Sequence, residues 1–133
     1  MAGATLDGFT ITRVGLYDED SWKKHWDEQG ENQSHARIGT FGKPAIAITG
    51  HNCTVTNNIV RHNGDTGIAI VGVEGTSTAP IVVGNVCYRN MGGGIGSMKG
   101  STAFIDGNTC FENLYAGIGH NGASPLVTNN LCY

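Results

Sequence analysis

Short segments in which every second residue is hydrophobic recur along most of the chain, and Gly, Asn and Asp separate them. Five of these segments align without gaps, and they cover residues 6–13, 55–62, 82–89, 105–112 and 127–133. The fourth position of the unit falls at residues 9, 58, 85, 108 and 130, so successive units are 49, 27, 23 and 22 residues apart. No helical periodicity competes within them, and this spacing predicts a repeat fold.

A second strand motif occupies residues 45–48, 67–70, 94–97 and 117–120, between successive units. Each repeat then carries about three short strands, and stacked repeats place equivalent residues about 4.8 Å apart. This arrangement predicts three apolar columns inside an all-β solenoid. The columns are Leu6, Val55, Val82, Ile105 and Val127; Ile46, Ile68, Ile95 and Ile118; and Ile11, Val60, Cys87, Cys110 and Cys132.

Alternation within the second motif predicts an outer face with almost no side chains. If its Ile residues point inward, the outward residues are Ala45, Ala47, Gly67, Ala69, Gly94, Gly96, Gly117 and Gly119. We expect this flat Gly/Ala face to carry no acid, base or nucleophile.

Asn recurs at two corners of the repeat. Asn tolerates left-handed backbone, and its side-chain amide can bond the Asn of the next repeat. We therefore assign these residues a structural role. The two sets are Asn58, Asn85, Asn108 and Asn130, and Asn63, Asn90 and Asn113.

The repeat resembles the right-handed parallel β-helix family, whose larger members include pectate lyase-like and other polysaccharide-processing enzymes. The resemblance covers residues 6–133 apart from one insertion, and it implies a solenoid of about five rungs. It is specific for the fold and not for the chemistry. We predict a single domain over residues 1–133.

The insertion covers residues 17–43 and contains both Trp residues of the chain. Asp20 or Ser21 is a suitable N-cap for a short helix that runs to about Gln29 and ends at Gly30.

Trp22 and Trp26 are four residues apart, so they share one face of this helix. One interpretation is that this face packs against the side of the solenoid or covers an open end. The alternative is a sugar-stacking groove lined by Trp22, His25 and Trp26.

Carboxylates offer no clear catalytic or metal site. The acidic residues of the insertion are oxygen ligands of the kind Ca²⁺ prefers, but they lack a calcium-loop motif, so we expect no metal. Asp7 and Asp106 are three rungs apart, on the order of 14 Å, which is too far for a glycosidase pair. We therefore predict no catalytic residues and no cofactor. The acidic residues considered for Ca²⁺ are Asp18, Glu19, Asp20, Asp27, Glu28 and Glu31.

Tyr88, Phe111 and Tyr133 follow Arg61 in one predicted column, and we expect the aromatic rings to stack on each other. The alternative is that Tyr88 and Phe111 form a platform for a sugar or partner. The next column contains His62, Arg89 and Glu112, for which a charge-matched surface ladder is our main interpretation and an acid–base pair the alternative.

The sequence has no C-x-x-C motif, which does not favour a metal site. Cys87, Cys110 and Cys132 share an apolar column, so we expect free, buried thiols rather than disulfides. Such thiols are compatible with a reducing compartment.

Charge and hydropathy exclude some functions. The 133 residues carry a net charge of −3 without a Lys/Arg cluster, which does not favour nucleic-acid binding. No apolar run is long enough to span a membrane. The first residues do not resemble a signal peptide, so a complete chain would be cytoplasmic.

The favoured function is a non-catalytic β-helix module for self-association or partner binding. We expect a homo-oligomer, for example a dimer through an open end of the solenoid or through the Gly/Ala face. The alternative is a carbohydrate-binding or polysaccharide-processing protein of the lyase or hydrolase kind.

Overall fold

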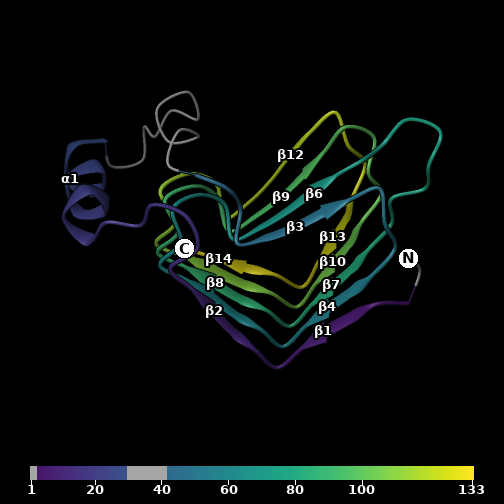
Figure 1. Ribbon diagram of the computed structural model, residues 1–133, viewed down its shortest axis with the longest axis horizontal. Helices are drawn as coiled ribbons and strands as arrows, with labels where there is room; N and C mark the ends of the chain where they lie inside the picture. The colour runs from purple at the N-terminus through teal and green to yellow at the C-terminus, as the bar shows by residue number, and fades with distance from the viewer. Residues whose placement is uncertain (1–2, 30–41) are drawn as a thin grey trace.

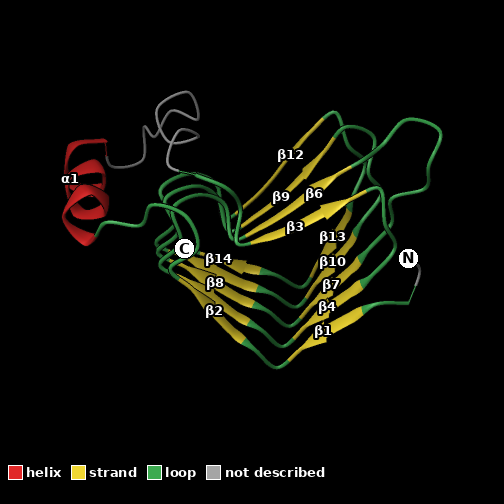
Figure 2. Ribbon diagram, viewed as in Figure 1, coloured by secondary structure: helices red, strands yellow, loops and turns green. Residues whose placement is uncertain are grey.

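The protein forms a parallel β-solenoid with one short helix on its flank (Figure 1). The structure is a computed structural model that describes residues 3–29 and 42–133. Each turn of chain adds one strand to each of three sheets, which form the three sides of the solenoid (Figure 2). Sheets A and B have five strands and sheet C has four, which makes about four complete turns. The solenoid predicted from the repeats is confirmed.

The strands are short, and successive rungs add them to each sheet in chain order. Sheet A contains β1 (Thr5–Asp7), β4 (Thr54–Thr56), β7 (Ile81–Val83), β10 (Phe104–Asp106) and β13 (Leu126–Thr128). Sheet B contains β2 (Thr10–Thr12), β5 (Ile59–Arg61), β8 (Val86–Tyr88), β11 (Thr109–Phe111) and β14 (Leu131–Cys132). Sheet C contains β3 (Ile46–Thr49), β6 (Ile68–Val71), β9 (Ile95–Met98) and β12 (Ile118–Asn121).

The strand register confirms the three apolar columns. In sheet A, for example, Val55 pairs with Val82 and Val82 with Ile105. The middle rungs bury these side chains completely, and Val60, Val82 and Ile105 are all 0% exposed. One rung has too few apolar contacts to be stable alone, and the shared core makes the stack cohesive.

Both predicted Asn ladders are also confirmed. The backbone N–H and the Nδ2 of Asn58 both donate to Oδ1 of Asn85, each at 3.0 Å, and Asn85 donates in the same way to Asn108. A second ladder runs from Asn63 through Asn90 to Asn113. These amides satisfy backbone groups at corners that no sheet hydrogen bond reaches.

A residue with left-handed backbone precedes each ladder. At the corner between sheets A and B this residue is Gly or Asn, as in Gly84 and Asn57. At the corner that follows sheet B it is never Gly. The four residues there are Arg13, His62, Arg89 and Glu112, with φ from 50° to 59°.

The prediction that all eight Gly and Ala residues of the second motif face outward is wrong for half of them. A Cβ at Gly94 would lie 2.5 Å from the carbonyl oxygen of Gly117 and 2.9 Å from Sγ of Cys110, and Gly67 and Gly117 are equally crowded. Ala45, at the same position, packs against the core. These residues precede the strands, where the chain turns and period-2 alternation no longer applies. The outer column of sheet C is Ala47, Ala69, Gly96 and Gly119.

Helix α1 (Glu19–Gln29) begins two residues earlier than an Asp20 cap would allow. The cap is Asp18, whose Oδ2 accepts the backbone N–H of Ser21 at 2.8 Å. The prediction of Asp20 or Ser21 as N-cap is therefore wrong, because both lie within the first turn. The predicted end at Gly30 and the carboxylate of Glu31 lie outside the described residues. No helix among residues 3–29 and 42–133 has the length and apolarity needed to cross a membrane.

The helix packs on the flank of the solenoid, beside the corner that follows sheet B. Trp22 is 5% exposed and forms a small apolar cluster with Met91 and Leu114. Tyr17 packs against the same cluster from the edge. This confirms the interpretation that the Trp face covers the side of the solenoid.

Candidate functional site

Charged side chains gather where sheet B ends and the chain turns toward α1. Arg61 is the last residue of β5 and is in register with Thr12 and Tyr88. The next residue in each rung has left-handed backbone, which gives the column Arg13, His62, Arg89 and Glu112. Stacking therefore places Arg13, Arg61 and Arg89 in three successive rungs on one edge.

A hollow of about 460 Å³ opens between the first two rungs of this edge and the segment that leads into α1. We call it the corner hollow. No ion pair joins Arg13 or Arg61 to an acidic group among residues 3–29 and 42–133. Two guanidinium groups are thus available in a hollow that also offers hydroxyl and carboxylate oxygens. Its lining is Thr12, Arg13, Gly15, Tyr17, Asp18, Glu19, Arg61 and His62.

His62 lies at the centre of the edge. Its ring makes edge contacts with Tyr17 and with Tyr88, at centroid distances of 5.2 and 5.7 Å. Burial lowers the pKa of His62 below its ordinary value of 6.5, and the nearby positive charges, chiefly Arg61, lower it further. The imidazole is therefore neutral at pH 7, and can both donate and accept a hydrogen bond.

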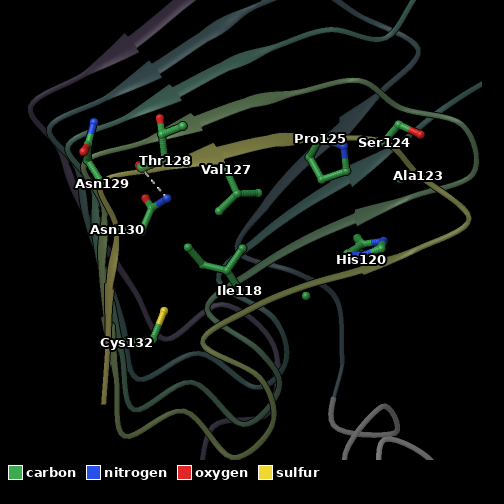
Figure 3. A pocket seen from close by; sticks show the side chains of 11 residues that line it. Ile118, His120, Ala123, Ser124, Pro125, Val127, Thr128, Asn129, Asn130 and Cys132 are labelled. Atoms are coloured by element: carbon green, nitrogen blue, oxygen red, sulfur yellow. Dashed lines mark hydrogen bonds between the residues drawn. The ribbon is translucent and has the colours of Figure 1, made fainter.

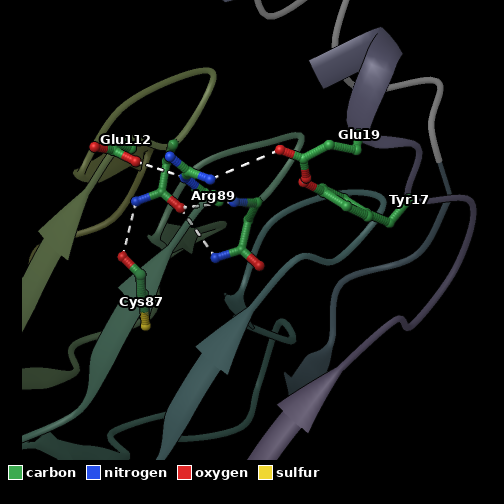
Figure 4. Close-up of polar contacts among 7 residues, drawn as sticks. Tyr17, Glu19, Cys87, Arg89 and Glu112 are labelled. Carbon is green, nitrogen blue, oxygen red and sulfur yellow. Dashed lines mark hydrogen bonds and ion pairs between the residues drawn. The ribbon is translucent and has the colours of Figure 1, made fainter. Parts of the chain in front are cut away.

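Arg89 ties the helix to the solenoid (Figure 4). Its Nε donates to Oε2 of Glu112 at 2.6 Å, and its Nη1 lies 3.7 Å from Oε1 of Glu19. The guanidinium also lies 5.1 Å from the ring centroid of Trp22. The predicted charge-matched ladder therefore exists between Arg89 and Glu112, but His62 has arginines on both neighbouring rungs.

Tyr17 completes this network by donating its hydroxyl to Glu19. Burial and this hydrogen bond raise the pKa of Tyr17 well above its ordinary value. The hydroxyl therefore stays protonated, and Glu19 is held between Tyr17 and Arg89 rather than free.

The residues predicted as a sugar-stacking groove do not form a common surface. Trp22 is buried, and Trp26 stacks on it at 5.2 Å between centroids and 14° between planes. Nδ1 of His25 lies 2.8 Å from the carbonyl oxygen of Ser21. Trp26, at 38% exposed, presents its remaining surface to solvent.

The aromatic stripe is a self-stacked ladder. The rings of Tyr88 and Phe111 are 4.7 Å apart with a 6° angle, and those of Phe111 and Tyr133 are 5.1 Å apart with a 5° angle. These contacts occupy both faces of Phe111 and one face of Tyr88, which leaves little ring surface for stacking on a sugar.

The two aspartates at the corner between sheets A and B have structural partners. Asp7 accepts hydrogen bonds from Thr56 and Asn57, and these lower its pKa. Asp106 is bound in the same way by Thr128 and Asn129 one rung further on. Within the described part of the chain, no three metal-binding side chains of the His, Cys, Asp and Glu type lie close enough to hold an ion together.

Sequence reasoning identified Arg61, His62 and Arg89 as column members but not the corner hollow. Tyr17 and Glu19 belong to the insertion, and no repeat register links them to Arg89. One sequence signal could have pointed to this site. Charged residues recur at a corner position whose left-handed backbone is least unfavourable for Gly.

Comparison with known proteins supports the fold. The family model for the right-handed β-helix region matches residues 34–133. No curated protein matches the chain, and no solved structure does. Because the family match covers well over half of the sequence and the structure is a parallel β-solenoid, this chain belongs to the right-handed β-helix family.

Proposed function

We propose that this chain is a non-catalytic binding module that holds a carboxylated polysaccharide in the corner hollow. The observation that supports this most is the pair Arg13 and Arg61, which line one hollow without an acidic partner among the described residues. Guanidinium groups match carboxylates in geometry and form charge-assisted hydrogen bonds with them.

The surroundings of the two arginines favour a sugar acid over a simple anion. Thr12 and Tyr17 bring hydroxyl groups to the lining, and Asp18 brings a carboxylate that accepts hydrogen bonds from sugar hydroxyls. Neutral His62 adds a group that donates and accepts. The whole chain carries a net charge of −3, so it has no general electrostatic attraction to polyanions. Binding of an acidic polymer would depend on this local basic edge.

Binding without cleavage is favoured by the state of the acidic groups. Glycoside hydrolysis uses two carboxyl groups on either side of the scissile bond. Glu19 is engaged by Tyr17 and Arg89, and Asp18 caps α1. Neither is placed as a free acid or base.

The test compares polygalacturonate with its fully methyl-esterified form, because the two polymers differ only in the carboxylate charge. We expect calorimetric binding to polygalacturonate only, with affinity that falls as salt is raised. Arg13→Gln with Arg61→Gln should weaken it roughly 10- to 100-fold, the value of one or two charged hydrogen bonds. Lys99→Gln, which removes one exposed positive charge beyond sheet C, is the matched control.

Equal affinity for the methyl ester, or no effect of the double substitution, would contradict this proposal. The same samples are followed by ultraviolet absorbance and by a reducing-sugar assay. New unsaturated uronate ends would show a lyase, and new reducing ends without unsaturation would show a hydrolase, in place of a binding module.

A second candidate function is self-association through the last rung. Val127 is 44% exposed, whereas its neighbour in the column, Ile105, is 0% exposed. A hollow of about 640 Å³ lies on this face, with Ile118 and Val127 at its base (Figure 3). We propose a dimer through this face, to be tested by light scattering over a range of concentrations. A mass that stays at one chain throughout would exclude it.

A further inference from the structure

Three cysteines stack directly above one another on the inner side of sheet B. Cys87 in β8 pairs with Cys110 in β11, and Cys110 pairs with Cys132 in β14. All three thiols are free, but the prediction that they are buried is wrong for Cys132, which is exposed because it lies in the last rung. Val60 and Ile11 continue the same column in the earlier rungs, so an aliphatic side chain also fits the position.

The spacing of this column suits a bridging cation better than a disulfide. Parallel strands in register repeat at about 4.8 Å, whereas a disulfide needs Cβ atoms about 3.8 Å apart. Zinc–thiolate bonds are about 2.3 Å long, and a linear sulphur–metal–sulphur unit with bonds of similar length has its sulphurs about 4.6 Å apart. Stacked thiols therefore match a two-coordinate metal without a shift of the backbone.

The sulphur atoms of Cys110 and Cys132 pack against glycines, so no other side chain covers them from that side. A Cβ at Gly94 would lie 2.9 Å from Sγ of Cys110, and one at Gly117 would lie 2.8 Å from Sγ of Cys132. Cys110 and Cys132 also line one hollow of about 730 Å³, which gives a route from solvent. Cys132 lies on the face of the last rung, as Figure 3 shows.

Sulphur ligands are soft and favour soft metal ions, of which Cu(I) is one. A cysteine binds such an ion as the thiolate, so each ligand gives up its proton when the ion binds.

We propose that Cys110 and Cys132 bind one soft monovalent cation of the Cu(I) class between adjacent rungs, as a linear two-sulphur site. Each binding event releases two thiol protons to solvent and forms two metal–sulphur bonds, and no electron is transferred. The site does not depend on the corner hollow or on the proposed polysaccharide.

The test uses Ag(I), which has the same preference for sulphur and does not change oxidation state, with the reduced full chain. We expect one Ag(I) per chain by native mass spectrometry and a first coordination shell of two sulphur atoms by X-ray absorption. Cys110→Val and Cys132→Val should each weaken binding at least 100-fold in competition with a dithiol. Cys87→Val and Cys53→Ser, which keep the proposed pair, should bind as the unmodified chain does.

Thermal unfolding of every variant shows whether it is folded, and valine is tolerated at this column position in Val60. Unchanged binding by Cys110→Val would overturn the proposal, and so would loss of binding in Cys87→Val with retention in Cys132→Val. A disulfide between Cys110 and Cys132 in the aerated protein, seen as the loss of two hydrogens in mass, would refute the spacing argument.

Discussion

Asn85→Ala is expected to remove a large part of the stability of the solenoid. Asn85 is 0% exposed, and its Nδ2 donates to the carbonyl oxygen of Val55 at 2.9 Å and to Oδ1 of Asn108 at 3.0 Å. Its Oδ1 accepts both the backbone N–H and the Nδ2 of Asn58. Alanine removes these four bonds at once, together with a longer one of 3.4 Å from Nδ2 to the carbonyl oxygen of Val83.

The magnitude follows from what the substitution leaves behind. The backbone N–H of Asn58 becomes a buried donor without its partner, at about 1–3 kcal/mol, and each of the other three shorter bonds contributes about 0.5–1.5 kcal/mol. Together these give a loss of about 2.5–7.5 kcal/mol, against a total stability of about 5–15 kcal/mol for a domain. The amide also links three rungs, so its loss weakens the stacking of the whole solenoid.

Urea unfolding followed by circular dichroism measures this loss, with Asn121→Ala as the matched control. Asn121 is exposed on β12, so the same substitution there should change the unfolding free energy by less than about 0.5 kcal/mol. If Asn85→Ala costs less than about 1 kcal/mol, the ladder does not stabilise the fold and the reasoning fails.

Three further substitutions test other parts of the structure. Gly94→Ala should destabilise by about 2 kcal/mol or more in thermal unfolding, because its Cβ would meet backbone, whereas Gly96→Ala, with no atom closer than 3.9 Å, should be neutral or stabilising by up to about 1 kcal/mol. Because the pKa of His62 is lowered in the folded state, the unfolded chain takes up the proton first as pH falls through about 6.5, and the free energy of unfolding should decrease there. His62→Asn should reduce this pH dependence, as measured by urea unfolding at several pH values. Arg13→Gly should leave stability unchanged or raise it by up to about 1 kcal/mol while weakening polygalacturonate binding about 10-fold. A clear loss of stability would show that Arg13 is structural.

Most of the solenoid follows from the sequence because stacking converts a linear repeat into columns. The alignment of residues 55–62 with 82–89 already fixes that Asn58 meets Asn85 and that Val60 meets Cys87. Such pairings need no knowledge of side-chain geometry. They depend only on the equal length of successive rungs.

The corner residues and the insertion could not be predicted in the same way. Alternation correctly places Gly96 on the outer face but fails for Gly94, since the chain turns there and the direction of Cβ depends on the corner geometry. The contact of Glu19 with Arg89 joins residues 70 positions apart through a helix that no repeat constrains. Only the arrangement in space shows that this insertion and the rungs enclose one hollow.

The backbone of the corner after sheet B links the fold to the proposed function. Left-handed backbone costs a non-Gly residue about 1–2 kcal/mol, and the corner between sheets A and B avoids this cost with Gly or Asn. The other corner has the same geometry but carries Arg13, His62, Arg89 and Glu112. For Arg89 and Glu112 the ion pair and the contact with Trp22 offset the strain. Arg13 has no such partner among the described residues, so the side chain is retained at a position where its removal should favour folding. Strain of this kind is typical of residues kept for binding, which is why the arginine edge, rather than the aromatic stripe, is the better candidate for the functional surface.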